Sequence, residues 1–216
     1  PTDTPTITAT PTETGTPTET STPGPTFTVT QTPTITQTPT ATLTPTVTPT
    51  TSVAAYDRAV NVGGAQYTDA SGVVWRADQP FATGGWGYVN PAPPTLSSMS
   101  YVNTHAIDGT ADDALYQSER FSLASYRFTV ANGSYRVLLR FAEIYPYTLP
   151  TKRVFDVQIE GATVLSRLDV VAAAGLWNAL EFTYTVDVTD GVLDVDFIPR
   201  VGYPKLNAIR VTSVGP

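Results

Sequence analysis

Alternation of apolar and polar residues, broken at short intervals by turn residues, is the feature that most constrains the fold of this chain. The clearest case is the stretch 115–145, LYQSERFSLASYRFTVANGSYRVLLRFAEIY, whose two alternating runs flank Asn132 and Gly133. A period of two places successive side chains on opposite faces of a strand. Asn-Gly supplies the positive backbone dihedrals of a tight hairpin turn. We therefore predict two long antiparallel strands joined by this turn, with the apolar face against a core and most arginines toward solvent.

The same kind of pattern continues through the rest of the chain. One alanine-rich segment, 170–176, predicts a short helical turn, and the glycine-flanked segment 84–88 predicts an aromatic loop. Many short strands separated by turns are typical of an antiparallel jelly-roll or Greek-key β-sandwich, so we predict an all-β fold of this class. Besides the central stretch, the predicted strands are 60–62, 73–77, 155–159, 163–165, 182–188, 193–197 and 206–211.

The first 51 residues differ from the rest in composition. Threonine occupies every even-numbered position from Thr2 to Thr50 except position 24, and prolines recur with a six-residue spacing. Such a segment cannot bury a core, and its prolines exclude a helix. We therefore predict an extended Thr/Pro-rich N-terminal tail at 1–51, acting as a stalk or assembly segment, and one β-sandwich domain at 52–216.

Two interpretations of this tail remain open. In the first interpretation, the tail is a stiff, O-glycosylated spacer that reaches on the order of 150 Å at roughly 3.1 Å per residue. Alternatively, the strict period of two places all threonines on one face of a β-like chain, and the more apolar odd positions from Phe27 onward pack against a neighbouring subunit in a filament. The candidate O-glycosylation sites are Thr28, Thr30, Thr34, Thr36, Thr40, Thr42 and Thr44.

Charge and composition exclude several classes of partner. The formal charge is −7, and the tail contributes three acids with no lysine or arginine, which leaves about −4 for the remainder. This balance disfavours nucleic acid and anionic lipid as partners, and no apolar run is long enough for membrane insertion. There is no cysteine. Because the sequence starts at Pro1 without Met or a signal peptide, we expect a fragment or processed product of a bacterial-type protein, secreted or on the cell surface.

The sequence offers little for catalysis. His105 is the single histidine, and no phosphate-cradling glycine loop is present. The acidic group at 187–196 is predicted to be a solvated face rather than a calcium site. Glu119 and Glu143 are predicted to form ion pairs that support nearby loops. The weaker alternative is that they are the two catalytic carboxylates of a glycosidase. We predict no enzyme activity, no metal and no cofactor.

Several segments, in order, carry a resemblance to the malectin domain family, and it extends from about residue 59 to 212. The resemblance implies a jelly-roll sandwich that binds a glucose-containing oligosaccharide without hydrolysing it. The segments are 59–64 (AVNVGG), 76–78 (RAD), 115–121 (LYQSERF), 141–145 (FAEIY), 154–157 (VFDV) and 204–206 (PKL).

Aromatic residues and one acidic residue hold the sugar in that family. By motif, the resemblance places these roles on Phe121, on Tyr145 with Tyr147 in place of a second ring, and on Trp86 or Tyr88. The family's acidic residue before Asn-Pro-Lys has no counterpart in Gly-Tyr-Pro-Lys at 202–205. Flat rings match the C–H face of a pyranose, and neighbouring polar groups fix its hydroxyls. The predicted carbohydrate-binding residues are Trp86, Tyr88, Phe121, Tyr145, Tyr147, Glu119 and Glu143.

Two functions follow from these observations. The leading hypothesis is a non-catalytic, malectin-like carbohydrate-binding module on an extracellular Thr/Pro stalk. The alternative is a structural subunit of an extracellular filament that self-associates through its glycan-bearing tail. The aromatic clusters favour the first, and the threonine row together with the missing acidic residue favours the second.

Overall fold

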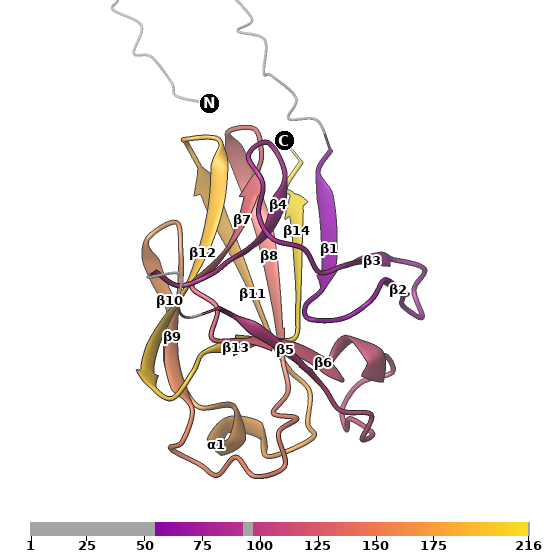
Figure 1. Cartoon of the computed structure of the whole chain (residues 1–216). Coiled ribbons are helices and arrows are strands. Elements are labelled where there is room, and N and C mark those ends of the chain that lie inside the picture. Colours follow the sequence, from indigo (N-terminus) through magenta and orange to yellow (C-terminus); the bar gives the residue numbers. More distant parts are fainter. Residues whose placement is uncertain (1–54, 93–96, 216) are drawn as a thin grey trace, which may run out of the picture. The chain divides into compact units, whose positions relative to one another are not determined.

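A computed structural model describes residues 55–92 and 97–215 (Figure 1). The predicted stalk, its boundary with the domain and all its threonine sites lie outside these residues. The described elements are strands except for a 3₁₀ turn at Asp113–Leu115 and the helix α1, Val170–Ala174. The strands are β1 (Asp57–Asn61), β2 (Tyr67–Thr68), β3 (Val74–Ala77), β4 (Trp86–Val89), β5 (Met99–Val102), β6 (Ser118–Phe121), β7 (Ser125–Thr129), β8 (Gly133–Phe141), β9 (Val154–Ile159), β10 (Ala162–Leu168), β11 (Leu180–Val188), β12 (Val192–Val201), β13 (Lys205–Leu206) and β14 (Ala208–Ser213).

The strands form three sheets. One has the order β11-β8-β14-β1-β3-β2, the second β10-β9-β12-β7-β4, and the third, smaller sheet β13-β6-β5. Among the described strands, every pairing is antiparallel except that of β1 with β3. The predicted all-β, antiparallel sandwich is thereby confirmed.

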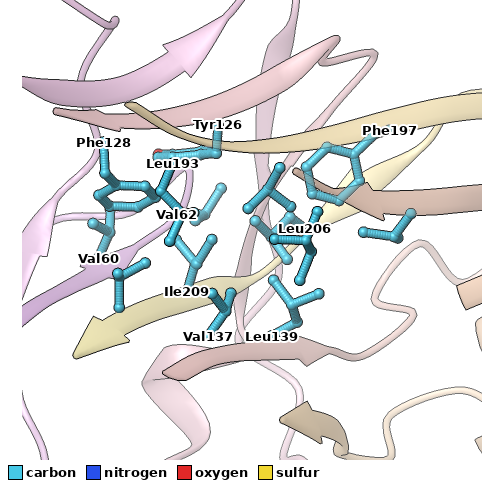
Figure 2. Packing of buried hydrophobic residues seen from close by; sticks show 14 of the residues in the cluster. Val60, Val62, Tyr126, Phe128, Val137, Leu139, Leu193, Phe197, Leu206 and Ile209 are labelled. Atoms are coloured by element: carbon cyan, nitrogen blue, oxygen red, sulfur yellow. The ribbon is translucent and has the colours of Figure 1, made fainter. Parts of the chain in front are cut away.

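The main core lies between the two large sheets (Figure 2). The longer strands contribute alternate residues to it, as a period of two requires when one face of a sheet is buried. Figure 2 shows side chains of β7 and β12 facing side chains of β1, β8 and β14 across this interior. The facing residues are Tyr126, Phe128, Leu193 and Phe197 on one side, and Val60, Val137, Leu139 and Ile209 on the other.

The predicted hairpin at Asn132-Gly133 is wrong. β7 pairs with β4 and β12, whereas β8 pairs with β11 and β14, so the connection crosses from one large sheet to the other. The Asn132 side chain donates to the carbonyl of Thr189 instead of closing a two-residue turn. Both strands bury their aromatic faces, and these faces meet across the core. Alternation alone does not distinguish this arrangement from a hairpin within one sheet.

Other local predictions have mixed outcomes. The predicted strands 155–159 and 163–165 do form a hairpin through a turn at Glu160-Gly161, because Ile159 of β9 pairs with Ala162 of β10. The alanine-rich segment does form α1, and the Asp169 side chain caps it by accepting from the backbone N–H of Ala172 at 3.0 Å. The predicted aromatic loop at 84–88 is wrong in its second half, where β4 begins and pairs with β7.

Asp69 organises the turn between β2 and β3. Its Oδ1 accepts hydrogen bonds from the backbone N–H groups of Ser71 and Val73, both at 2.9 Å. Its Oδ2 accepts from Nε1 of the buried Trp75 at 2.8 Å. Burial by itself raises the pKa of Asp69, but these hydrogen bonds to the charged form outweigh it and lower the pKa from 3.8 to about 2.

We expect the stability of the domain to fall on acidification partly through Asp69. Because the folded-state pKa is depressed, the stabilisation is present above pH 3.8 and is lost as the pH falls toward 2. Solvent screening around this partly exposed carboxylate limits the effect to about 1 kcal/mol. Urea unfolding of the wild type and of Asp69→Asn at pH 2, 3 and 4 measures it. Equal losses of stability in the two proteins would contradict the assignment.

Candidate functional site

A pocket of about 290 Å³ opens on the small sheet and the loops around it. Figure 1 shows β5, β6 and β13 of this sheet side by side, near the lower ends of β8 and β14. The pocket combines aromatic walls with one carboxylate and one guanidinium group. Its lining residues are Tyr101 of β5, Glu119 and Phe121 of β6, Tyr145 after β8, Arg153 before β9, and Tyr203 before β13.

The strand register of the small sheet brings the pocket floor together. Tyr101 of β5 lies opposite Glu119 of β6, and Phe121 follows two residues later on the same face of β6. The backbone of β6 is fixed by a close approach of Gly63, where a Cβ would overlap the carbonyl oxygen of Glu119. Gly63 has φ of +72°, a conformation that favours glycine. The sequence thus holds Glu119 in place through its backbone as well as its side chain.

Tyr145 stands at the centre of the aromatic wall. Its ring makes edge contacts with Tyr101, at 5.7 Å between centroids, and with Tyr147, at 5.6 Å. Tyr145 is 43% exposed and Tyr203 is 56% exposed, so both rings leave apolar surface open to a ligand. Tyr–Tyr edge contacts of this kind fix the ring planes.

A buried lysine supports the carboxylate of the pocket. Lys205 has no exposed surface, and its ammonium group donates hydrogen bonds to Oε2 of Glu119 and to the carbonyl of Ala142. It also lies 3.9 Å from Oε1 of Glu143, which is fully buried as well. A buried charge is tolerated only when it is paired and hydrogen-bonded, and this lysine meets both conditions.

Glu143 lies behind the pocket and positions two of its walls. Its Oε1 accepts from the backbone N–H of Tyr145 at 3.0 Å, and its Oε2 accepts from Nε of Arg153 at 2.9 Å. Arg153 also donates through Nη1 to the carbonyl of Tyr203 at 2.7 Å. One buried carboxylate therefore orients the central ring, the guanidinium group and, through it, the loop that carries Tyr203.

The pKa of Glu119 is raised above its ordinary value. Burial is the main cause, and the negative charge of Glu143 adds to it, while the nearby Lys205 opposes the shift. Lys205 donates one hydrogen bond to Oε2 of Glu119, and Glu119 also contributes to the pocket lining. The pocket therefore has a hydrogen-bond acceptor, the Glu119 carboxylate, on one side and a hydrogen-bond donor, the Arg153 guanidinium group, on another.

Comparison with known proteins identifies the family. The model of the family described as "Malectin domain" matches residues 56–209. The chain belongs to the malectin domain family. Malectin-B of Xenopus laevis is 29% identical to it over 140 residues, which are 63% of this chain and 47% of that protein. The chain spans about half the length of the curated relatives of this kind that it matches.

Solved structures contain the same fold. A Bacteroides uniformis β-glucuronidase is 29% identical, with a TM-score of 0.67, and the match covers 74% of this chain but 18% of the enzyme. The plant receptor-like kinase FER gives a TM-score of 0.55 over 72% of this chain and 48% of that chain, at 20% identity. The second likeness shows the fold alone.

The malectin domain brings only part of the predicted set together. Glu119, Phe121 and Tyr145 line the pocket. Tyr147 lies beside it in an adjoining depression, and Glu143 is buried beneath it. The predicted ion pairing of the two glutamates exists, but with partners that the sequence did not indicate: Lys205 for Glu119 and Arg153 for Glu143.

Trp86 and Tyr88 do not line this pocket. Both belong to β4 and are partly buried against the main core. The guanidinium group of Arg58 lies 5.4 Å from the Trp86 ring centre, and that of Arg120 lies 3.5 Å from the Tyr88 ring centre. Their rings are thus occupied by packing and cation–π contacts. The expectation that they share one site with Tyr145 is not supported by the geometry.

Three pocket residues were missed from the sequence. Tyr101, Arg153 and Tyr203 come from β5 and from two loops, far apart in the chain. Tyr203 directly precedes the Pro-Lys segment of the family motif, which was the one available signal for it. Tyr101 and Arg153 had no such signal, because their proximity depends on strand pairing and on the buried Glu143.

The remaining predictions concern His105, metal binding and membrane insertion. His105 is exposed and stacks on Trp177 at 4.4 Å between ring centres. In the described part of the chain, no group of three or more His, Cys, Asp or Glu side chains is arranged to hold a metal ion. Within the same residues, no helix combines the length and the apolar character needed to cross a membrane.

Proposed function

We propose that this malectin domain is a non-catalytic carbohydrate-binding module whose pocket holds a glucose-containing unit of a glycan. The observation that carries the proposal is the pocket in which Tyr101, Phe121 and Tyr145 surround space beside Glu119 and Arg153. Its volume of about 290 Å³ is near the lower end for small-ligand sites. Family membership supports the same function.

The chemistry of the pocket suits a neutral pyranose. The exposed ring surfaces offer apolar area for the C–H face of a sugar, as aromatic side chains do in many binding sites. Glu119 offers an acceptor and Arg153 a donor, so hydroxyl groups of the sugar can be bound from two sides. The second carboxylate that a glycosidase requires does not line the pocket, because Glu143 is buried and bonded to Arg153.

A binding experiment on the full chain tests the proposal. We expect the protein to bind glucose-containing oligosaccharides on a glycan array, and calorimetry with the best of them to give saturable one-site binding. We also expect the oligosaccharide to be recovered intact after prolonged incubation. Absence of binding to every glucose-containing glycan would overturn the function, and release of shorter sugars would overturn its non-catalytic character.

We place the protein outside the cell or on its surface, with the Thr/Pro segment as an O-glycosylated stalk. The threonine content and proline spacing of residues 1–51 support this setting. Mass spectrometry of peptides from this segment of the native protein tests it. Unmodified threonines at all seven candidate positions would contradict the glycosylation.

A second candidate function is a filament subunit that self-associates through residues 1–51. The observation in its favour is the uninterrupted row of even-numbered threonines between Thr26 and Thr50, with more apolar residues between them. Electron microscopy of the full chain and of a chain lacking residues 1–51 separates the two candidates. Ordered polymers that require the tail support the filament, and monomers that bind sugar support the module.

A further inference from the structure

A second depression, of about 220 Å³, adjoins the pocket of Glu119. The two have three lining residues in common: Tyr145, Arg153 and Tyr203. They are therefore neighbouring parts of one surface, divided by these side chains. A glycan with one unit in the first pocket can place its next unit in the second.

The two depressions differ in charge. Glu119 and Arg153 are the groups of opposite charge that line the first. Lys152 and Arg153 line the second, and none of its described lining residues carries a carboxylate. Lys152 is exposed, and in the described part of the chain it has no ion-pair partner. Arg153 is paired with the buried Glu143, so the exposed Lys152 gives this depression an excess of positive charge, in a chain whose net charge is −7.

The guanidinium group of Arg153 is fixed in an orientation that suits the binding of an anion. Nε is bonded to Glu143 and Nη1 to the carbonyl of Tyr203, which fixes the plane of the guanidinium group. Its remaining nitrogen, Nη2, has no hydrogen-bond partner among the described residues. A guanidinium fixed in this way loses little side-chain freedom on binding a carboxylate.

An aromatic ring completes the second depression. Tyr147 is 79% exposed and its ring is inclined at 72° to the ring of Tyr145, so most of its apolar surface is open to a sugar ring. The combination of an open ring with two cations fits a pyranose that carries a negative group.

We propose that the second depression binds an acidic sugar unit, with its uronate carboxylate at Lys152 and Arg153, linked to the neutral unit in the pocket of Glu119. This inference rests on the proposed function, because the neutral unit anchors the ligand. It assigns the domain to mixed neutral–acidic oligosaccharides rather than to uncharged glucans.

Matched pairs of ligands test this assignment. The probes are glucose disaccharides of all linkages, each with a counterpart in which one glucose is replaced by glucuronic acid. We expect calorimetry on the full chain to give at least one acidic counterpart that binds about fivefold to tenfold more tightly than its neutral partner. The preference is expected to shrink between 20 and 500 mM NaCl, because salt screens exposed charges.

Single substitutions test whether the preference for acidic over neutral disaccharides depends on Lys152. Lys152→Gln is expected to bring the ratio of the two affinities close to one, and Lys152→Arg to restore it. Arg136→Gln removes one positive charge from an exposed side chain of β8 and serves as the control that keeps the ratio. Equal affinity for neutral and acidic partners, or a preference that survives Lys152→Gln, overturns the inference while leaving the proposed function standing. Failure of all probes to bind overturns both.

Discussion

Replacing Lys205 by methionine is expected to lower the free energy of unfolding by about 3–5 kcal/mol. The change leaves the buried Glu119 without its cation and removes a second cation from beside Glu143, which keeps its ion pair with Arg153. The carbonyl of Ala142 also loses a donor. An unpaired buried charge costs far more than an unpaired surface charge. Urea unfolding at pH 7, followed by tyrosine and tryptophan fluorescence, measures the loss.

The chain supplies its own control for this change. Lys152, the other lysine in the sequence, is exposed, so Lys152→Met is expected to change the stability by less than about 0.5 kcal/mol. Combining Lys205→Met with Glu119→Gln is expected to recover part of the loss, because the uncompensated charge of Glu119 is removed. Similar unfolding midpoints for the two lysine variants would show that the buried cluster contributes little.

Tyr145→Ala is expected to weaken binding of the best neutral oligosaccharide about 30-fold to 100-fold, equivalent to about 2–3 kcal/mol. The ring stands between the two depressions and contacts Tyr101, so its removal deletes a stacking surface and loosens a second ring. Because Tyr145 is 43% exposed, the folded domain should keep most of its stability.

Tyr147→Ala is the matched control, since it deletes the same type of ring from a residue that is 79% exposed and lines only the second depression. We expect a loss of less than about fivefold for the neutral ligand. Calorimetry on both variants, with far-UV circular dichroism as a check of folding, measures the difference. A larger loss for Tyr147→Ala would place the neutral sugar elsewhere.

The general fold could be predicted because a period of two reports directly on which residues face a core. Tyr126 and Phe128, like Val137 and Leu139, are buried as that pattern requires. The pairing of their strands could not be predicted, since a crossing between sheets and a hairpin bury the same residues.

Strand geometry alone accounts for the part of the site that one strand carries, whereas Tyr145 was indicated by the family motif. Glu119 and Phe121 lie two residues apart on β6 and share a face by strand geometry alone. Tyr101 joins them through the pairing of β5 with β6, and Arg153 through its bond to Glu143. Such long-range contacts leave no local periodicity. The sequence therefore pointed to Trp86, a locally conspicuous aromatic residue, which does not line this pocket.

The placement of the pocket on the small β13-β6-β5 sheet has a consequence for evolution. The rings of Tyr145, Tyr147 and Tyr203 face outward, so substitutions at these positions leave the interior of the two large sheets unchanged. Sugar preference can therefore diverge between descendants of one ancestral domain at little risk to folding. Mutations that reach Lys205 or Glu143 lack this freedom, and drift in specificity should be confined to the outer ring of side chains.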